Sequence, residues 1–234
     1  MSRREESKPM KISVYLGIGS KRTFAGGLEW PGWCRGGKDE ASALQALLDY
    51  APRYAAAMRP ARLGFQPPDA ISAFTVAERL RGDSTTDFGA PGCIPARDAD
   101  PVDEAELRRL QSILKACWRT LDRVAESAEG KTLRSGPRGG GRDLKKMVSH
   151  VREAEKAYLS KLGWKPGAHT ENTQRTGSKD EHWLDSLNAL TAAAHGKLPA
   201  RGPRGGAHWP PRYFTRRSAW HILDHAWEIE DRAG

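Results

Sequence analysis

The chain has 234 residues, a mean hydropathy of -0.67 and a formal net charge of +9. This length allows one large domain or two small ones, and the lack of an apolar run as long as a membrane span argues against an integral membrane protein. Residues 1–11 are polar and charged, and their basic residues are not followed by the apolar core of a signal peptide, which predicts a cytoplasmic protein without a secretory signal. The three cysteines are far apart, so they indicate neither a disulfide framework nor a thiolate zinc site.

Much of the positive charge lies in two Gly-rich segments, 134–142 and 201–217. Clustered Lys and Arg side chains neutralise phosphates in nucleic-acid-binding proteins. No recognised DNA-binding motif accompanies them, so nucleic-acid binding ranks third among the functions considered below. We interpret the two segments as solvated loops, with a cationic rim for an acidic ligand as the alternative.

The N-terminal third of the chain has the pattern of a small α+β domain, residues 1–81. Alternating apolar residues predict strands at 11–18 and 23–30, and 70–80 is expected to return to the same antiparallel sheet. The run 38–50 predicts a helix that Pro52 limits. The apolar stripe expected on this helix consists of Ala41, Leu44, Leu47 and Leu48.

A strand hairpin that ends in Trp30-Pro31-Gly32, followed by Gly37-Lys38-Asp39-Glu40-Ala41 at a helix start, resembles the small HicB-type antitoxin module. HicB-like folds serve as partner-binding or adapter modules. The resemblance therefore implies a protein partner for this domain and no chemistry. We interpret Trp30 and Trp33 as packing residues.

Residues 82–101 are rich in Gly and Pro, a composition expected to sustain neither a helix nor a central strand. We predict an ordered linker. A linker of this length in a compact protein is usually functional or lies across a neighbouring domain.

Four amphipathic helices are predicted in residues 102–234, which indicates an all-α four-helix bundle. The helices are expected at 102–129, at 143–162 between an Asp143 N-cap and Gly163, at 179–195, and at 212–232. The connection 164–178 is long enough to cross the whole bundle, which predicts an up-down-down-up order. The inward stripe of the third helix is expected to hold Trp183, Leu184, Leu187, Leu190 and Ala194.

Three histidines are candidates for a metal site. His221 and His225 are spaced i, i+4 on the inward stripe of the fourth helix, so both rings can bind one ion. His150 lies on the flank of the apolar face of the second helix and can also point inward. Three imidazoles with further coordination positions open favour Zn or Ni. The other histidines are expected in loops or near the ends of the third helix: His169, His182, His195 and His208.

The segments Lys146–Glu155 with Tyr158-Leu159, and Arg217–Glu228, resemble the two metal-bearing helices of DinB-like proteins. In that family one His of the second helix and a His-x-x-x-His pair of the fourth form the metal triad, which matches His150, His221 and His225. The family includes S-transferases and isomerases that use mycothiol, bacillithiol or glutathione, and many members of no known activity. The N-terminal α+β domain departs from the family pattern.

An open tri-histidine site lowers the pKa of a bound water or thiol. We therefore predict a divalent-metal-dependent enzyme of the thiol S-transferase or hydrolase type, acting on a small molecule with or without a thiol cofactor such as mycothiol. The alternative is a non-enzymatic regulatory protein in which the metal stabilises the bundle and the N-terminal domain recruits a partner. A homodimer is left open.

Two further groups of residues could serve this site. Carboxylates that orient the metal-bound imidazoles are one group, with surface ion pairs as the alternative reading of each. Its candidates are Glu153, Glu155, Asp224 and Glu228. The other group would line the mouth of the site, where arginines suit a carboxylate-bearing thiol or substrate. Its candidates are Arg212, Tyr213, Arg216, Arg217 and Trp220.

Overall fold

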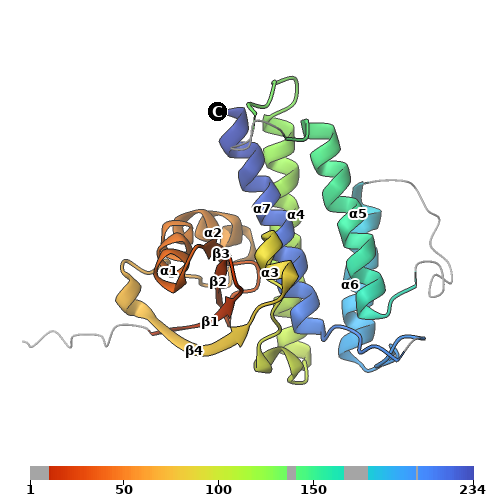
Figure 1. Ribbon diagram of the computed structural model, residues 1–234. Coiled ribbons are helices and arrows are strands. Elements are labelled where there is room, and N and C mark those ends of the chain that lie inside the picture. Colours follow the sequence, from red (N-terminus) through yellow and green to blue (C-terminus); the bar gives the residue numbers. More distant parts are fainter. Residues whose placement is uncertain (1–10, 136–140, 166–178, 204) are drawn as a thin grey trace, which may run out of the picture. The chain divides into compact units, whose positions relative to one another are not determined.

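The computed structural model describes residues 11–135, 141–165, 179–203 and 205–234 (Figure 1). The chain forms two compact units. The first unit consists of residues up to Ala55 together with Gln66–Pro95, and the second of Ala56–Phe65 and Ala96–Gly234. Among the helices in the described ranges, none is long and apolar enough to cross a membrane.

The first unit contains a four-stranded mixed sheet with the strand order β3-β2-β1-β4. Its strands are β1 (Ile12–Ile18), β2 (Thr23–Gly27), β3 (Cys34–Gly37) and β4 (Phe74–Arg81). β2 is antiparallel to both β1 and β3, whereas β4 is parallel to β1. The prediction of a purely antiparallel sheet is therefore wrong at β4. A parallel return needs a crossover connection, which the helices between β3 and β4 provide.

The predicted helix after the hairpin is α1 (Glu40–Asp49). It begins at Asp39, whose carboxylate accepts a hydrogen bond from the Ser42 backbone N–H. In return, the Ser42 hydroxyl accepts one from the Asp39 backbone N–H, which completes a capping box. Ala43 is buried and Ala41 exposed, so the predicted stripe was wrong at Ala41. Pro52 does more than limit α1, because it lies in the first turn of α2 (Ala51–Met58), where proline is tolerated. Short 3-10 helices follow at Arg59–Ala61 and Ile71–Ala73.

Trp33 is a core residue, in agreement with its interpretation as a packing residue. Its indole N–H donates a hydrogen bond to the Leu47 carbonyl at 2.9 Å. Its ring stacks on Tyr54, and the Tyr54 hydroxyl donates to the Pro31 carbonyl at 2.8 Å. The Trp-Pro-Gly-Trp turn, residues 30–33, is thus fixed onto the helices of this unit.

The segment 82–101 contains helical turns, contrary to the prediction that its composition sustains none. Helix α3 (Ser84–Phe88) begins at Asp83, whose side chain accepts from the Thr85 and Thr86 backbone N–H groups, and ends at Gly89 with a φ of 117°. These caps offset the poor helix propensity of the segment. The 3-10 helix η3 (Ala96–Ala99) belongs to the second unit.

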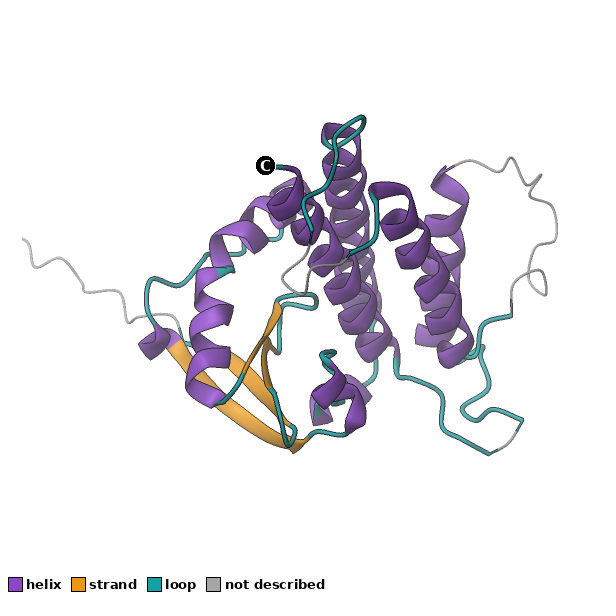
Figure 2. Ribbon diagram, turned by 45° about the horizontal axis from the view of Figure 1, so that its top comes forward, coloured by secondary structure: helices purple, strands orange, loops and turns teal. Residues whose placement is uncertain are grey.

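The second unit is mostly helical, as predicted (Figure 2). Asp143 caps the second of its long helices by accepting from the Lys146 N–H, and Gly163 ends that helix with a φ of 93°. Both ends were expected from the sequence. The long helices are α4 (Glu104–Ser127), α5 (Leu144–Leu162), α6 (Lys179–Ala194) and α7 (Pro211–Ala233).

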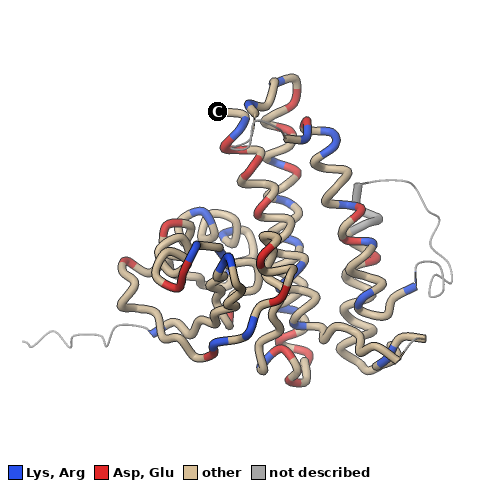
Figure 3. Tube along the Cα trace, in the orientation of Figure 1, with Lys and Arg blue, Asp and Glu red and all other residues tan. Residues whose placement is uncertain are grey.

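Helices α4 and α7 run in parallel along each other. Arg212 forms an ion pair with Glu106 near the start of both helices, and Arg123 forms one with Glu230 near their ends, at 3.4 Å. Figure 3 shows basic and acidic residues interspersed along both helices. These two ion pairs thus contribute to the pairing of the two helices, and an exposed ion pair contributes only a modest amount.

Helix α6 runs opposite to α4. His195, just past its last turn, pairs with Glu104 at the start of α4, and the Trp183 ring stacks on Trp118 in the middle of α4 with ring centroids 5.4 Å apart. Leu184 is 45% exposed, so the predicted inward stripe was wrong at this residue. Among side chains 183–194 of α6, for which burial is described, those that are fully buried are Ser186, Ala189 and Leu190. Most of the connection predicted to cross the bundle, including His169, lies outside the described residues.

Candidate metal centre

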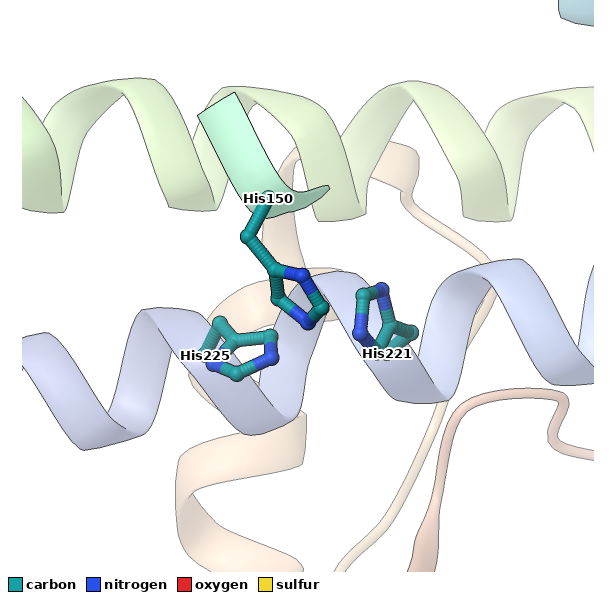
Figure 4. Close-up of side chains that lie close together, drawn as sticks. All are labelled: His150, His221 and His225. Atoms are coloured by element: carbon teal, nitrogen blue, oxygen red, sulfur yellow. The ribbon is translucent and has the colours of Figure 1, made fainter. Parts of the chain in front are cut away.

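The three histidines singled out from the sequence lie together in the second unit (Figure 4). Each offers one ring nitrogen, and these nitrogens all lie within 4.8 Å of one another. The ring centroids of His150 and His221 are 5.1 Å apart, those of His150 and His225 5.1 Å, and those of His221 and His225 4.7 Å. The structure thus brings together one imidazole from α5 and two from α7.

The local packing of α5 and α7 explains this convergence. The two helices run in opposite directions. The Trp209 backbone N–H, just before α7, donates to the Lys161 carbonyl near the end of α5, whereas His150 in the first half of α5 lies beside His225 in the second half of α7. Val151 on α5 and Ile222 on α7 are buried next to the histidines in sequence. Each helix therefore turns its apolar face inward and holds the adjacent imidazoles at the contact.

The environment favours neutral imidazoles. His221 is 7% exposed, and burial lowers its pKa to about 2, with the positive charges of His225 and Arg217 acting in the same direction. Burial also lowers the pKa of His150, helped by Arg142 and His225 and opposed by Glu153. Neutral imidazole is the form that binds metal, so these two rings keep their ligand lone pairs near neutral pH.

The hydrogen bonds of the histidines fit a metal ligand set. His225 Nδ1 lies 3.0 Å from a carboxylate oxygen of Glu228, which leaves its Nε2 for a ligand. His221 Nδ1 is buried and has no hydrogen-bond partner among the described residues. A buried polar nitrogen without a partner is destabilising, so this ring favours a bound ligand.

Glu228, one of the four carboxylate candidates, contacts His225. Its second carboxylate oxygen accepts from the Arg232 guanidinium at 2.9 Å, and the Arg232 Nε–H donates to the Arg134 carbonyl at 2.7 Å. The hydrogen bond with His225 lowers the pKa of Glu228 against the opposing effect of burial. Glu228 is thus a charged acceptor that fixes the His225 ring.

The other three carboxylates have different positions. Glu153 is exposed and accepts from the Ser149 hydroxyl at 3.3 Å, while its charge acts on the pKa of His150. Glu155 is buried and faces α4, where it accepts from the Trp118 indole N–H at 2.8 Å. Burial raises the pKa of Glu155 to about 8. Asp224 is half-buried on α7.

Two of the three candidate arginines are engaged away from the histidines. Arg212 pairs with Glu106, and Arg216, at 4% exposed, forms two 2.8 Å hydrogen bonds with the fully buried Asp98 of η3. Both therefore stabilise the fold. Arg217 instead lowers the pKa of His221, which places its charge beside the triad.

Aromatic rings surround this end of the triad. Trp220 is buried beside His221, with ring centroids 6.1 Å apart, and Tyr213 is buried against Trp209 at 4.9 Å. Tyr158, part of the segment that resembles a DinB-like metal-bearing helix, was not among the predicted site residues, yet its ring lies 5.7 Å from that of His221. Its spacing of eight residues from His150 was the available signal, because two helical turns return to the same face. Trp209 precedes α7 and gave no such signal.

Comparison of the chain with models of known protein families, with curated proteins and with solved structures found no match. The DinB-like and HicB-like resemblances therefore stay predictions. The candidate metal centre rests on the geometry of His150, His221 and His225 and on the polar groups around them.

Proposed function

We propose that His150, His221 and His225 hold one divalent metal ion, with Zn or Ni preferred. The observation that carries the proposal is the convergence of three imidazoles from two helices within 4.8 Å. Within the described residues, the buried Nδ1 of His221 has no hydrogen-bond partner, which supports the proposal independently. Three protein ligands leave coordination positions open, which is typical of catalytic rather than structural zinc.

We propose further that α4–α7 form a DinB-like four-helix bundle of up-down-down-up order. The helix directions support this order, since α4 and α7 run in parallel and α5 and α6 each run opposite to one of them. In this arrangement the triad joins the second and fourth helices of the bundle. That is the placement that the family resemblance implies.

The activity that this site favours is metal-dependent S-transfer from a thiol, or hydrolysis, on a small molecule. A divalent ion at the triad would lower the pKa of a bound thiol or water and so supply a nucleophile. Glu228 keeps the His225 ring oriented. Arg217 offers a positive charge to a negatively charged reactant, and its guanidinium lies over the Tyr158 ring, which packs against Trp209.

The reaction class is tested on metal-reconstituted full-length protein with two probes. Conjugation of glutathione to 1-chloro-2,4-dinitrobenzene reports S-transfer, and release of nitrophenol from p-nitrophenyl acetate reports hydrolysis. We expect one of the two activities, lost on chelation and in His225→Ala. His195→Ala is the matched control, because His195 is exposed at the end of α6 and pairs with Glu104. One bound metal per chain without either activity would contradict the enzymatic part and favour a structural metal in a regulatory protein.

A further inference from the structure

Arg217 and Tyr158 form a second layer beside the histidine triad. Arg217, His221 and His225 are spaced by four residues each on α7, so they follow one another along one face of the helix. Tyr158 lies two turns beyond His150 on α5 and contacts the His221 ring. The helix faces that carry the triad therefore also carry a cation, Arg217 on α7, and a phenol, Tyr158 on α5.

The Arg217 side chain is half-buried, and its guanidinium packs against two aromatic rings. It lies 4.7 Å from the centre of the Trp220 ring and 5.5 Å from that of Tyr158. Arg217 also hydrogen-bonds the Tyr158 hydroxyl. These contacts hold the guanidinium in one orientation.

One Arg217 nitrogen, Nη1, is buried and has no hydrogen-bond acceptor within the described part of the chain. A charged N–H group that loses water without gaining an acceptor is strongly disfavoured. On the same helix, Arg216 has such an acceptor in the carboxylate of Asp98. Arg212 pairs with Glu106 through Nη1, although its Nε is likewise buried without an acceptor among the described residues. A bound anion would supply the hydrogen-bond acceptor that Arg217 Nη1 lacks in the described part of the chain.

The positive charge beside the triad also favours an anionic ligand. Arg217 lies one helical turn before His221 on α7, and its guanidinium lies over the Tyr158 ring that contacts His221, so its positive charge lies beside the triad. Glu228, the carboxylate that contacts His225, is already shared between His225 and Arg232. A divalent ion would add to this positive charge, and low-dielectric aromatic walls strengthen its effect. An anionic ligand would offset it.

We propose that Arg217 binds the carboxylate of a small organic acid whose second donor group binds the metal at the triad. This inference rests on the proposed metal site and narrows its substrate or cofactor class. One helical turn separates Arg217 from His221, which is about 6 Å along the helix axis. The ligand therefore carries its carboxylate and its metal-binding group a few bonds apart. A planar guanidinium can donate hydrogen bonds to both carboxylate oxygens at once, which selects carboxylates over neutral groups.

The inference is tested with two thiols of equal chain length, 3-mercaptopropionate and 3-mercapto-1-propanol. Each is titrated into Co-loaded full-length protein, and the change in the cobalt absorption gives the dissociation constant. The parent is expected to bind the carboxylate thiol about tenfold more tightly than the alcohol, as for a hydrogen bond to a charged group. Arg217→Gln should abolish this preference. Arg119→Gln, which removes an equal charge from the exposed face of α4, should keep it.

The cobalt content of every sample is measured first, so that failure of the metal site can be told apart from failure of the role of Arg217. If the parent binds no cobalt, the proposed metal site is wrong and this inference falls with it. If cobalt binds and Arg217→Gln keeps the carboxylate preference, the metal site stands and the role of Arg217 is refuted. Equal affinity of the parent for both thiols also overturns the inference, and that result does not depend on how well the variant folds.

Discussion

Replacing Glu155 by Gln should change how the stability of the protein depends on pH. Glu155 is 5% exposed between α5 and α4, and burial raises its pKa from 4.5 to about 8. Between these two pH values the folded protein keeps a proton that the unfolded chain releases. The free energy of unfolding therefore falls as pH rises through this window, and it levels off above the folded pKa.

The magnitude follows from linkage. Relative to acidic pH, the Glu155 ionisation lowers the free energy of unfolding by about 2 kcal/mol at pH 6 and by about 4 kcal/mol at pH 8. Gln cannot ionise, but its carbonyl oxygen can still accept the Trp118 indole hydrogen bond. Between pH 6 and pH 8 the parent should thus lose about 2 kcal/mol more stability than Glu155→Gln.

The assay is urea unfolding of metal-free protein at both pH values, followed by circular dichroism. Other titrating groups are common to the parent and the variant, so they cancel in the difference between the two proteins. Equal pH dependence in the parent and in Glu155→Gln would refute the reasoning. It would mean that Glu155 ionises in the folded protein as it does in the unfolded chain.

Two other substitutions test the parts of the structure that hold the site. Asp98→Ala leaves Arg216 buried without its carboxylate and should lower the free energy of unfolding by about 3 kcal/mol, whereas Asp98→Ala with Arg216→Met should recover much of the loss in the same urea assay. No recovery in the double variant would contradict a buried ion pair. Glu228→Gln keeps an acceptor for His225 but removes the charge, so metal affinity measured by chelator competition should fall about tenfold, while Glu126→Gln on the exposed face of α4 should leave it unchanged. Unchanged affinity in Glu228→Gln would mean that Glu228 does not tune the site.

The sequence predicted those features that depend on local spacing. Asp143 and Gly163 mark the ends of α5 through their own capping chemistry, and the i, i+4 pair fixed two of the three rings on one face of α7. Helical spacing alone also indicates that Glu155 and Arg216, both predicted to serve the site, lie away from the triad. Five residues correspond to about 140° around a helix, so Glu155 faces away from His150, and Arg216 from His221.

Other features depend on partners that are remote in the sequence. The pairing of Arg216 with Asp98 joins residues 118 positions apart, and neither residue type predicts its partner. The strand β3 has the sequence Cys-Arg-Gly-Gly, which shows no apolar alternation, and it forms because β2 provides backbone partners. The parallel position of β4 is set by the packing of the crossover helices. Periodicity within β4 could not show it.

The central claim is that one divalent ion is bound by the imidazoles of His150, His221 and His225. The most direct measurement is zinc K-edge X-ray absorption on protein reconstituted with one equivalent of zinc and purified without a metal-chelating tag. The parent should show three imidazole ligands at about 2.0 Å. His221→Ala should lose an imidazole ligand or the zinc itself, and His195→Ala should match the parent. Zinc bound with the same number of imidazoles in His221→Ala as in the parent would contradict the account.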